Sequence, residues 1–358
     1  MLLVPVYLIA LLLSFYLLAK VCDDYFVESL DEISNKLKLS SDAAGATLMA
    51  IGSSAPELFV AVISVIRPGN HEQIGMGTIV GSAVFNLIAI TGAVGLIGQF
   101  VVNKAIILRD LFFYLTGVVF LYLVFVDGNI SLSEALLFPI FYVIYVILVV
   151  KWEKIVPFKP EVKIIEEKKE QKEKSTDSDT FFVIKKIVQP LDYLISVLFP
   201  AKAEMFYVFF VSIGLIGLFS WVLVESAIKI SEIINVPEAF IALTVLAIGT
   251  SIPDLLSSII VARQKRGGMA VTNAIASNIF DVLIGMGIPF LILIIMYGKE
   301  VAIKTDSLIS STGLLIISIV GMIILLIINR WNIGKRMGYS LLAFYIAFLL
   351  YEFFILTA

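Results

Sequence analysis

Two stretches of the sequence are nearly the same: AIGSSAPEL, from Ala50 to Leu58, and AIGTSIPDL, from Ala247 to Leu255. They align without a gap at an offset of 197 positions, and both contain a proline followed by an acid. Further on, SAVFN at 82–86 matches SNIFD at 277–281 at an offset of 195. Chance similarity between apolar helices does not explain matches of this length, so the chain carries an internal repeat with one copy in each half.

The composition around these stretches is that of a membrane protein. Of the 358 residues, 60% are hydrophobic and only 15% are charged, and the mean hydropathy is +1.02, which is more apolar than soluble domains are. The net charge of −3 gives no sign of a nucleic-acid partner. The single cysteine, Cys22, excludes an intrachain disulfide, and the single histidine, His71, excludes a multi-histidine metal site.

A helix needs about 20 apolar residues to cross a bilayer, and ten segments meet that requirement. They are 3–21, 42–66, 75–98, 107–126, 130–150, 204–228, 238–262, 269–296, 307–328 and 338–356. The first lacks the basic start and the small-residue cleavage site of a signal peptide, so we expect it to be a retained span. The sequence therefore predicts an all-α membrane protein with ten transmembrane helices.

The segment 151–203 divides these spans into two groups of five. Its central part, Lys163 to Thr180, is rich in charge and low in aromatic residues, and we expect it to be mobile. Phe181 to Phe199 has apolar residues at helical spacing, which predicts a helix on the membrane surface. The expected domains are a first five-helix repeat at 1–150, a loop with this surface helix at 151–203, and a second five-helix repeat at 204–358.

The distribution of basic residues predicts the orientation of the chain. If the N-terminus lies outside, the inside loops hold 22 of the 26 lysines and arginines, as the positive-inside rule requires. We therefore expect both termini outside and the segment 151–203 in the cytoplasm, in a protein integral to the plasma membrane. An odd number of spans in each half gives the halves opposite orientations, so the repeats are predicted to be inverted. Interrupted apolar segments at matching places of inverted repeats indicate a secondary transporter with a site near the midplane.

The polar residues of the first motif share one face of a helix. Ala50, Ser53, Ser54 and Glu57 follow the spacing i, i+3, i+4, i+7. In the second half the same face is formed by Ala247, Thr250, Ser251 and Asp254. On the helices that follow, the spacing i, i+4 joins Ser82 to Asn86 and Ser277 to Asp281.

The prolines of the two motifs add backbone oxygens to these faces. Pro56 cannot donate a hydrogen bond to the carbonyl of Gly52, and Pro253 cannot donate one to Gly249. A carbonyl freed inside a membrane needs a partner, and a bound cation is one. The resulting set of carboxylate, hydroxyl, amide and carbonyl oxygens suits hard cations such as Ca²⁺ and Na⁺.

Three acids, Glu57, Asp254 and Asp281, lie within these spans, where a carboxylate costs on the order of 3 kcal/mol. A structural ion pair is the alternative to a cation site, but no lysine or arginine lies inside the four helices. Ca²⁺ with one monovalent cation, three Na⁺, or Ca²⁺ with one protonated acid would each balance the charge. For the hydroxyls, the alternative to a ligand role is a hydrogen bond to their own helix.

At these residues the sequence resembles the cation/calcium exchanger superfamily, whose repeats carry paired Gly-Ser/Thr-Ser-x-Pro-acid motifs. The forms GSSAPELF, GTSIPDL and SNIFD are most similar to those of the potassium-dependent sodium/calcium exchangers. The resemblance implies antiport of Na⁺ against Ca²⁺, with K⁺ as a candidate companion of Ca²⁺ and no cofactor. Asp281 is shared with potassium-dependent members and with some prokaryotic exchangers, so it does not settle K⁺ use.

The resemblance also implies the ligands. They are the carbonyl groups of Ala50 and Ala247 and the side chains of Ser53, Ser54, Glu57, Ser82, Asn86, Thr250, Ser251, Asp254, Ser277 and Asp281. The expected partners are these ions and the lipid bilayer, and no protein partner is evident.

Three other functions compete with this one. A Ca²⁺/H⁺ exchanger could use the same acids, although the proton-coupled branch usually has Gly-Asn-Ala before its acid. An intramembrane aspartyl protease could use Asp254 and Asp281, but its Gly-x-Gly-Asp motif is absent, so we expect no enzyme. A passive channel would conduct Ca²⁺ without a counter-ion.

Overall fold

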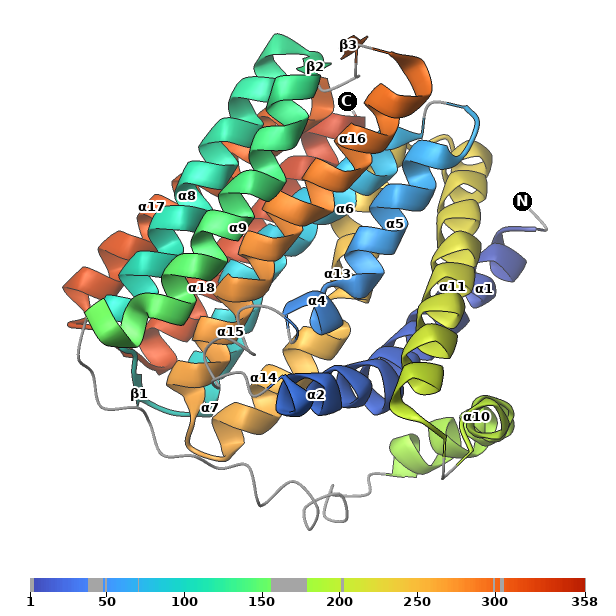
Figure 1. Cartoon of the computed structure of the whole chain (residues 1–358), viewed down its shortest axis with the longest axis horizontal. Coiled ribbons are helices and arrows are strands. Elements are labelled where there is room, and N and C mark those ends of the chain that lie inside the picture. The colour runs from blue at the N-terminus through green and yellow to red at the C-terminus, as the bar shows by residue number, and fades with distance from the viewer. Residues whose placement is uncertain are drawn as a thin grey trace.

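The structure is a computed structural model that describes residues 3–37, 48, 50–69, 71–155, 179–200, 203–298, 300–302 and 306–357. Over these residues the chain is a bundle of helices with two small sheets (Figure 1). Its long helices are apolar because the sequence gives them uninterrupted Leu, Ile, Val and Phe. The expected all-α membrane architecture is therefore confirmed for the described part of the chain.

The first half of the chain consists mainly of helices among its described residues. They are α1 (Val4–Val21), η1 (Cys22–Phe26, a π-helical turn), α2 (Val27–Lys36), α4 (Ala50–Ser53), α5 (Ala55–Ile66), α6 (Glu72–Val84), η3 (Phe85–Ile90, π-helical), α7 (Thr91–Ile97), α8 (Lys104–Asp127) and α9 (Leu132–Ile155).

A further helix, α10 (Asp179–Leu198), precedes the second half. It covers nearly all of the helix expected from Phe181 to Phe199. Of the charged segment expected to be mobile, residues 163–178 lie outside the described residues.

The second half is also helical. Its helices are α11 (Met205–Ile234), α12 (Glu238–Ile241), η4 (Ala242–Leu246, π-helical), α13 (Ala247–Thr250), α14 (Ile252–Arg263), α15 (Gly267–Phe280), η5 (Asp281–Gly285, π-helical), α16 (Met286–Tyr297), α17 (Asp306–Ile328) and α18 (Lys335–Thr357).

Eight helices among the described residues are long and apolar enough to cross a membrane. A ninth is added if Glu238–Thr250 and Ile252–Arg263, which meet at a bend of 41°, form one span. Of the expected span 42–66, residues 42–47 and 49 lie outside the described residues, and α5 contributes 12 residues. Ten transmembrane helices therefore remain a prediction.

The first helix differs from its expected range of 3–21. It continues without a break through η1 and α2, so that one apolar-to-amphipathic helix covers Val4–Lys36. The apolar run ends where Lys20, Asp23 and Asp24 begin, but no proline or glycine stops the helix there. Hydropathy locates the end of the apolar segment, whereas the helix itself extends well past it.

Two short sheets, which the sequence did not predict, pair strands from the two halves. Strand β1 (Phe100–Val101) pairs antiparallel with β4 (Asn332–Ile333), and β2 (Asn129–Ser131) pairs antiparallel with β3 (Glu300–Ala302). Figure 1 shows β2 and β3 at one end of the bundle and β1 at the other. Each end thus has a backbone connection between the halves.

The apolar residues form two buried clusters. One gathers α1, η1 and α11, and the other gathers α6, α8, α9 and α15 to α18. Helix α5 belongs to both, because Val60 and Ile63 face the first cluster while Ala61 and Val65 face the second. We call the first cluster the α1–α11 unit.

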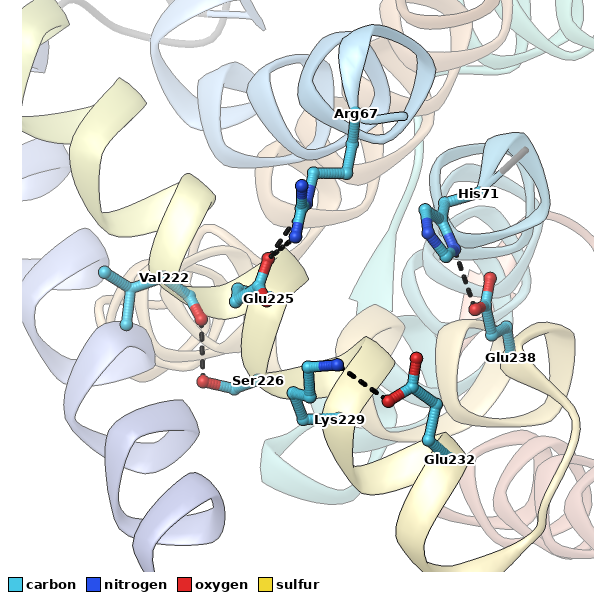
Figure 2. Close-up of polar contacts among 8 residues, drawn as sticks. All are labelled: Arg67, His71, Val222, Glu225, Ser226, Lys229, Glu232 and Glu238. Atoms are coloured by element: carbon cyan, nitrogen blue, oxygen red, sulfur yellow. Dashed lines mark hydrogen bonds and ion pairs between the residues drawn. The ribbon is translucent and has the colours of Figure 1, made fainter. Parts of the chain in front are cut away.

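An ion pair and a hydrogen bond join the halves at the end of the bundle away from α10. Arg67, which follows α5, places Nη2 2.8 Å from Oε2 of Glu225 on α11. His71, before α6, places Nδ1 2.8 Å from Oε1 of Glu238 on α12 (Figure 2). These contacts fasten the α5–α6 connection to α11 and α12.

Candidate cation-binding site

Both repeated motifs interrupt a helix at the same place. The first helix stops at Ser53 and restarts at Ala55, with Ser54 at φ −95° and ψ 6°. The second stops at Thr250 and restarts at Ile252, with Ser251 at φ −91° and ψ 4°. Each break lies two residues before a proline, which cannot continue the hydrogen-bond ladder behind it. The break anticipated from the prolines is present in both halves.

The helices that follow each motif are distorted by π-helical turns. Asn86 lies in η3, and Asp281 begins η5. A third such turn, η4, leads directly into the second motif. Such turns are rare, change the hydrogen-bonding pattern of the backbone and are frequent at functional sites. They have no residue signature, so the sequence could not reveal them.

The structure brings most of the predicted residues together, and it does so across the two halves. Ser251 Oγ donates a hydrogen bond to Glu57 Oε1 at 3.1 Å. Asn86 Nδ2 donates one to Asp254 Oδ2 at 3.1 Å. The hydroxyls of Ser53 and Ser277 are 3.0 Å apart. In each of these three contacts a first-half residue meets a second-half residue.

The carboxylates of this cluster are buried without a cationic partner. Glu57, Asp254 and Asp281 are exposed by only 1%, 4% and 1%, and the fields of Glu57 and Asp254 both act on Asp281. In the described part of the chain, no lysine or arginine forms an ion pair with any of the three. Three like charges in a low-dielectric region repel one another strongly.

Several buried oxygens in the cluster lack a hydrogen-bond partner among the described residues. They are Ser54 Oγ, Glu57 Oε2, Asn86 Oδ1 and both carboxylate oxygens of Asp281. Buried polar atoms are nearly always hydrogen-bonded, and although unsatisfied atoms also occur elsewhere in the bundle, such as at Glu352, those of this cluster lie among three carboxylates and could accept an electropositive ligand. Because carboxylate, amide and hydroxyl oxygens supply the set, that ligand is a hard cation or a proton.

The remaining predicted residues are turned to their own helices. Ser82 Oγ donates to the carbonyl of Ile79 at 3.0 Å, and Thr250 Oγ1 donates to that of Leu246 at 3.0 Å. The carbonyls of Ala50 and Ala247 accept backbone hydrogen bonds from Ser54 and Ser251. All four residues are buried beside the motifs. The carbonyls of Ala50 and Ala247 also accept long hydrogen bonds from Ser53 Oγ and Thr250 Oγ1, which a bound cation would have to displace, whereas the two hydroxyl oxygens keep lone pairs for a further contact.

The acids do not form a metal cluster by themselves. Among the described residues, no group of three His, Cys, Asp or Glu side chains converges closely enough to hold a metal ion. A cation at this place would therefore need the hydroxyl, amide and carbonyl oxygens as well as the carboxylates.

One buried contact was missed by the sequence reasoning. Asn278 Nδ2 donates to the carbonyl of Ala83 at 2.9 Å and to Tyr114 Oη at 3.1 Å. Asn278 and Ala83 occupy matching positions of the repeat, so repeat-related residues touch each other here. The signal was an amide within SNIFD, but nothing in the sequence showed that it faces the other half rather than the cation site.

Membrane-length helices, two matching breaks and a buried set of oxygens define a class of protein: a secondary transporter of cations. The chain belongs to the family described as sodium/calcium exchanger protein, whose model matches residues 7–151 and 205–354. The resemblance seen in the motifs is thereby confirmed. The chain is a membrane cation/Ca²⁺ exchanger, and its family relatives are transporters.

Curated relatives and solved structures agree with this assignment. Human sodium/potassium/calcium exchanger 4 is 27% identical, with 98% of this chain and 81% of that protein covered. Human sodium/potassium/calcium exchanger 2 is 27% identical, with 96% and 77% covered. The H⁺/Ca²⁺ exchanger CAX has a similar fold at a TM-score of 0.70 and 16% identity, with 96% of this chain and 82% of that chain covered. The sodium-calcium exchanger NCX_Mj follows at 0.56 and 24%, with 96% and 98% covered.

Proposed function

We propose that the protein is a secondary-active antiporter that exchanges Na⁺ for Ca²⁺ by alternating access, with K⁺ carried together with Ca²⁺. The observation that supports this most is the concentration of unpartnered, buried oxygens between the two interrupted helices, among the described residues. The cargo then takes the place of the missing hydrogen-bond partners. The names of the relatives at 27% identity, which are sodium/potassium/calcium exchangers, support the same three ions.

Glu57 and Asp254 are the proposed central ligands of Ca²⁺. They hold the same position in the two motifs, and each receives a hydrogen bond from the opposite half. Two carboxylates match the charge of one Ca²⁺, and Ser53, Ser54, Thr250, Ser251 and the two alanine carbonyls would complete a shell of six to eight oxygens. Na⁺ competes for the same oxygens, which is how one site serves an antiporter.

Asp281 supplies the third charge. Asn86, its counterpart in the repeat, donates its amide hydrogen to Asp254. Asp281 is an acid instead, and it cannot donate to Glu57 when ionised. In the described part of the chain its two oxygens accept no hydrogen bond of good geometry, although the Ser54 hydroxyl lies near enough to stabilise its charge. The charge of Asp281 repels those of Glu57 and Asp254. A monovalent cation or a proton bound at Asp281 would remove that repulsion. We assign the position to K⁺, with a proton as the alternative.

The wider architecture is proposed on the same basis. Ten transmembrane helices in two inverted five-helix repeats would place both interrupted helices near the midplane, with domains at 1–150, 151–203 and 204–358. The matching breaks at Ser54 and Ser251 support this arrangement. Both termini would lie outside the plasma membrane, and the segment with α10 would lie in the cytoplasm, as the basic residues indicate.

Reconstitution of the purified protein in liposomes tests the proposal. Vesicles loaded with Na⁺ and diluted into Na⁺-free medium should take up Ca²⁺, and a Na⁺ ionophore should stop the uptake. Uptake that follows only the Ca²⁺ gradient and the voltage would instead identify a channel. Uptake driven by an imposed pH gradient and indifferent to Na⁺ would identify the Ca²⁺/H⁺ exchanger.

A further inference from the structure

The helix Val4–Lys36 passes beside both interrupted helices. The ring of Phe15 packs against Gly249, and the side chains of Val27 and Leu30 pack against Gly52. Between these two contacts along the helix lies Asp23, in the π-helical turn η1. The turn changes the direction of the side chains that follow it. The carboxylate of Asp23 therefore lies beside the two breaks, on a helix that is part of neither interrupted helix.

Asp23 is electrostatically connected to the candidate site. Its charge acts on Asp254, and the adjacent Cys22 is within electrostatic range of both Glu57 and Asp254. Charges in water are screened over about 8 Å at physiological ionic strength. The charges of Asp23 and Asp254 therefore act on each other, although the two carboxylates lie on different helices.

Asp23 differs from Asp254 in its access to water. The side chain of Asp23 is more exposed than that of Asp254, which is buried, although the surroundings of Asp23 still exclude part of its water. A carboxylate turned toward lipid would cost on the order of 3 kcal/mol, so the exposed side chain is best accommodated facing water. Figure 1 shows α2, which continues this helix, at the same end of the bundle as α10. Asp23 precedes α2 on this helix, between the contacts that the helix makes with the two interrupted helices.

The next residue, Asp24, has a different environment. Lys20 Nζ lies 2.9 Å from Asp24 Oδ2 and 3.6 Å from Oδ1 of Asp192 on α10. Asp23 makes no hydrogen bond or ion pair with any described residue. Of two adjacent acids on one helix, Asp24 is therefore neutralised by a structural contact and Asp23 is left to interact with mobile cations.

We propose that Asp23 is an entry carboxylate that attracts hard cations toward the buried site from the side of the membrane where α2 and α10 lie. The inference rests on the proposed exchange of Ca²⁺ at Glu57 and Asp254. A single negative charge near a cation site raises the local concentration of a divalent cation and its rate of arrival. Asp23 thus affects how readily the site fills and leaves the coordination of the bound ion unchanged.

The first test compares Asp23→Asn with Asp24→Asn in proteoliposomes. At low ionic strength, Asp23→Asn should raise the apparent KM for Ca²⁺ by about three- to tenfold and leave the maximal rate unchanged. Asp23→Glu should retain the wild-type KM, and Asp24→Asn should change it by less than Asp23→Asn does. In high salt, the difference between Asp23→Asn and the wild type should shrink, because the field is screened.

The second test restores or reverses the charge at position 23 by covalent labelling of a cysteine. In the Cys22→Ser background, which serves as the reference, Asp23→Cys is treated with membrane-impermeant thiol reagents. An anionic sulfonatoethyl reagent should lower the KM for Ca²⁺, and a cationic trimethylammonium reagent should raise it. Both should act only from the side of α2 and α10. This test compares one folded protein before and after labelling, so it does not depend on how well Asp23→Asn folds.

The outcomes separate this inference from the proposed function. Wild-type protein that exchanges Ca²⁺ normally, with Asp23→Asn at the wild-type KM and reagents of both charges without effect, would overturn the role of Asp23 alone. A fall in maximal rate without a change in KM would also overturn it, because Asp23 would then be part of the transport step itself. Absence of Na⁺-dependent Ca²⁺ flux in the wild type would overturn both.

Discussion

At the scale of residues, the candidate site is a set of matched acids and hydroxyls whose contacts run between the two halves of the chain. The matched acids and hydroxyls were visible because a carboxylate in an apolar span is costly and usually marks an ion pathway. The pairs Ser251 with Glu57 and Asn86 with Asp254 were not visible, since they depend on how the halves approach each other. The role of Thr250 was no clearer, because its hydroxyl can bond to its own helix or to a cation by a small rotation.

The first residue prediction concerns the two central acids. Glu57→Gln and Asp254→Asn keep the volume of each side chain and remove its charge. Removing one partner of a buried ion pair, here the pair of a carboxylate with bound Ca²⁺, costs about 3–5 kcal/mol. Ca²⁺ transport should therefore fall by at least about 100-fold. Uptake is measured in Na⁺-loaded proteoliposomes. Glu28→Gln, at an exposed position on α2, is the control and should transport normally. Normal flux in either of the two test variants would show that its acid is not a central ligand.

A second prediction separates K⁺ from a proton at Asp281. If K⁺ occupies the position, Asp281→Asn should retain Na⁺/Ca²⁺ exchange but lose any stimulation by K⁺, because the amide no longer offers a charge. If a proton occupies it, the wild type should already ignore K⁺ and the substitution should alter mainly the pH dependence. Initial rates with and without K⁺, at several pH values, distinguish these results. Full wild-type exchange in K⁺-free solution would rule out the K⁺ assignment.

At the scale of elements, most helices were predictable and their irregularities were only partly so. Pro56 and Pro253 predicted the two breaks, because a proline has no N–H to donate to the carbonyl four residues earlier and so interrupts the helix at that point. The π-helical turns and the continuation of α1 into α2 were not predictable, since packing against other helices determines whether a helix persists. The β1–β4 and β2–β3 pairs join segments far apart in the sequence and contain only two or three residues each.

The close approach of α6 to the second motif gives a prediction at this scale. A Cβ at Gly81 would meet the carbonyl oxygen of Leu243 and lie 2.6 Å from the Cβ of Ala247. Gly81→Ala should therefore destabilise the protein by about 1–3 kcal/mol, as overpacking does. Gly214 on α11 has nothing within 4 Å of such a Cβ, and Gly214→Ala should stabilise the helix by roughly 0.5–1 kcal/mol.

Thermal unfolding of both variants in the same detergent checks this pair. A lower melting temperature for Gly81→Ala and an equal or higher one for Gly214→Ala is the expected result. Because the Gly81 contact lies next to Ser82 and against Ala247, Ca²⁺ exchange should fall in the first variant and persist in the second. Equal stability of the two would mean that α6 and the second motif are not in such close contact.

At the scale of the whole molecule, transport by alternating access requires one part to move relative to another. The α1–α11 unit has its own buried cluster, which makes it the natural moving part against the rest of the bundle. It contacts α5 through the buried side chains of Val60 and Ile63 and through the Arg67–Glu225 ion pair, whose side chains are about one-third exposed (Figure 2). Exposed pairs contribute only about 0.2–1 kcal/mol, so this contact can open and close during a transport cycle.

A crosslink at this pair should therefore stop exchange. In the Cys22→Ser background, Arg67→Cys with Glu225→Cys is joined by a short, reducible bifunctional thiol reagent, and Ca²⁺ uptake is measured before and after reductive cleavage. Transport should fall on crosslinking and return on reduction, because α11 can no longer move along α5. Asn129→Cys with Ala302→Cys, which joins paired strands β2 and β3 outside the α1–α11 unit, should transport normally when crosslinked. Undiminished exchange through the Arg67–Glu225 crosslink would place the motion elsewhere in the bundle.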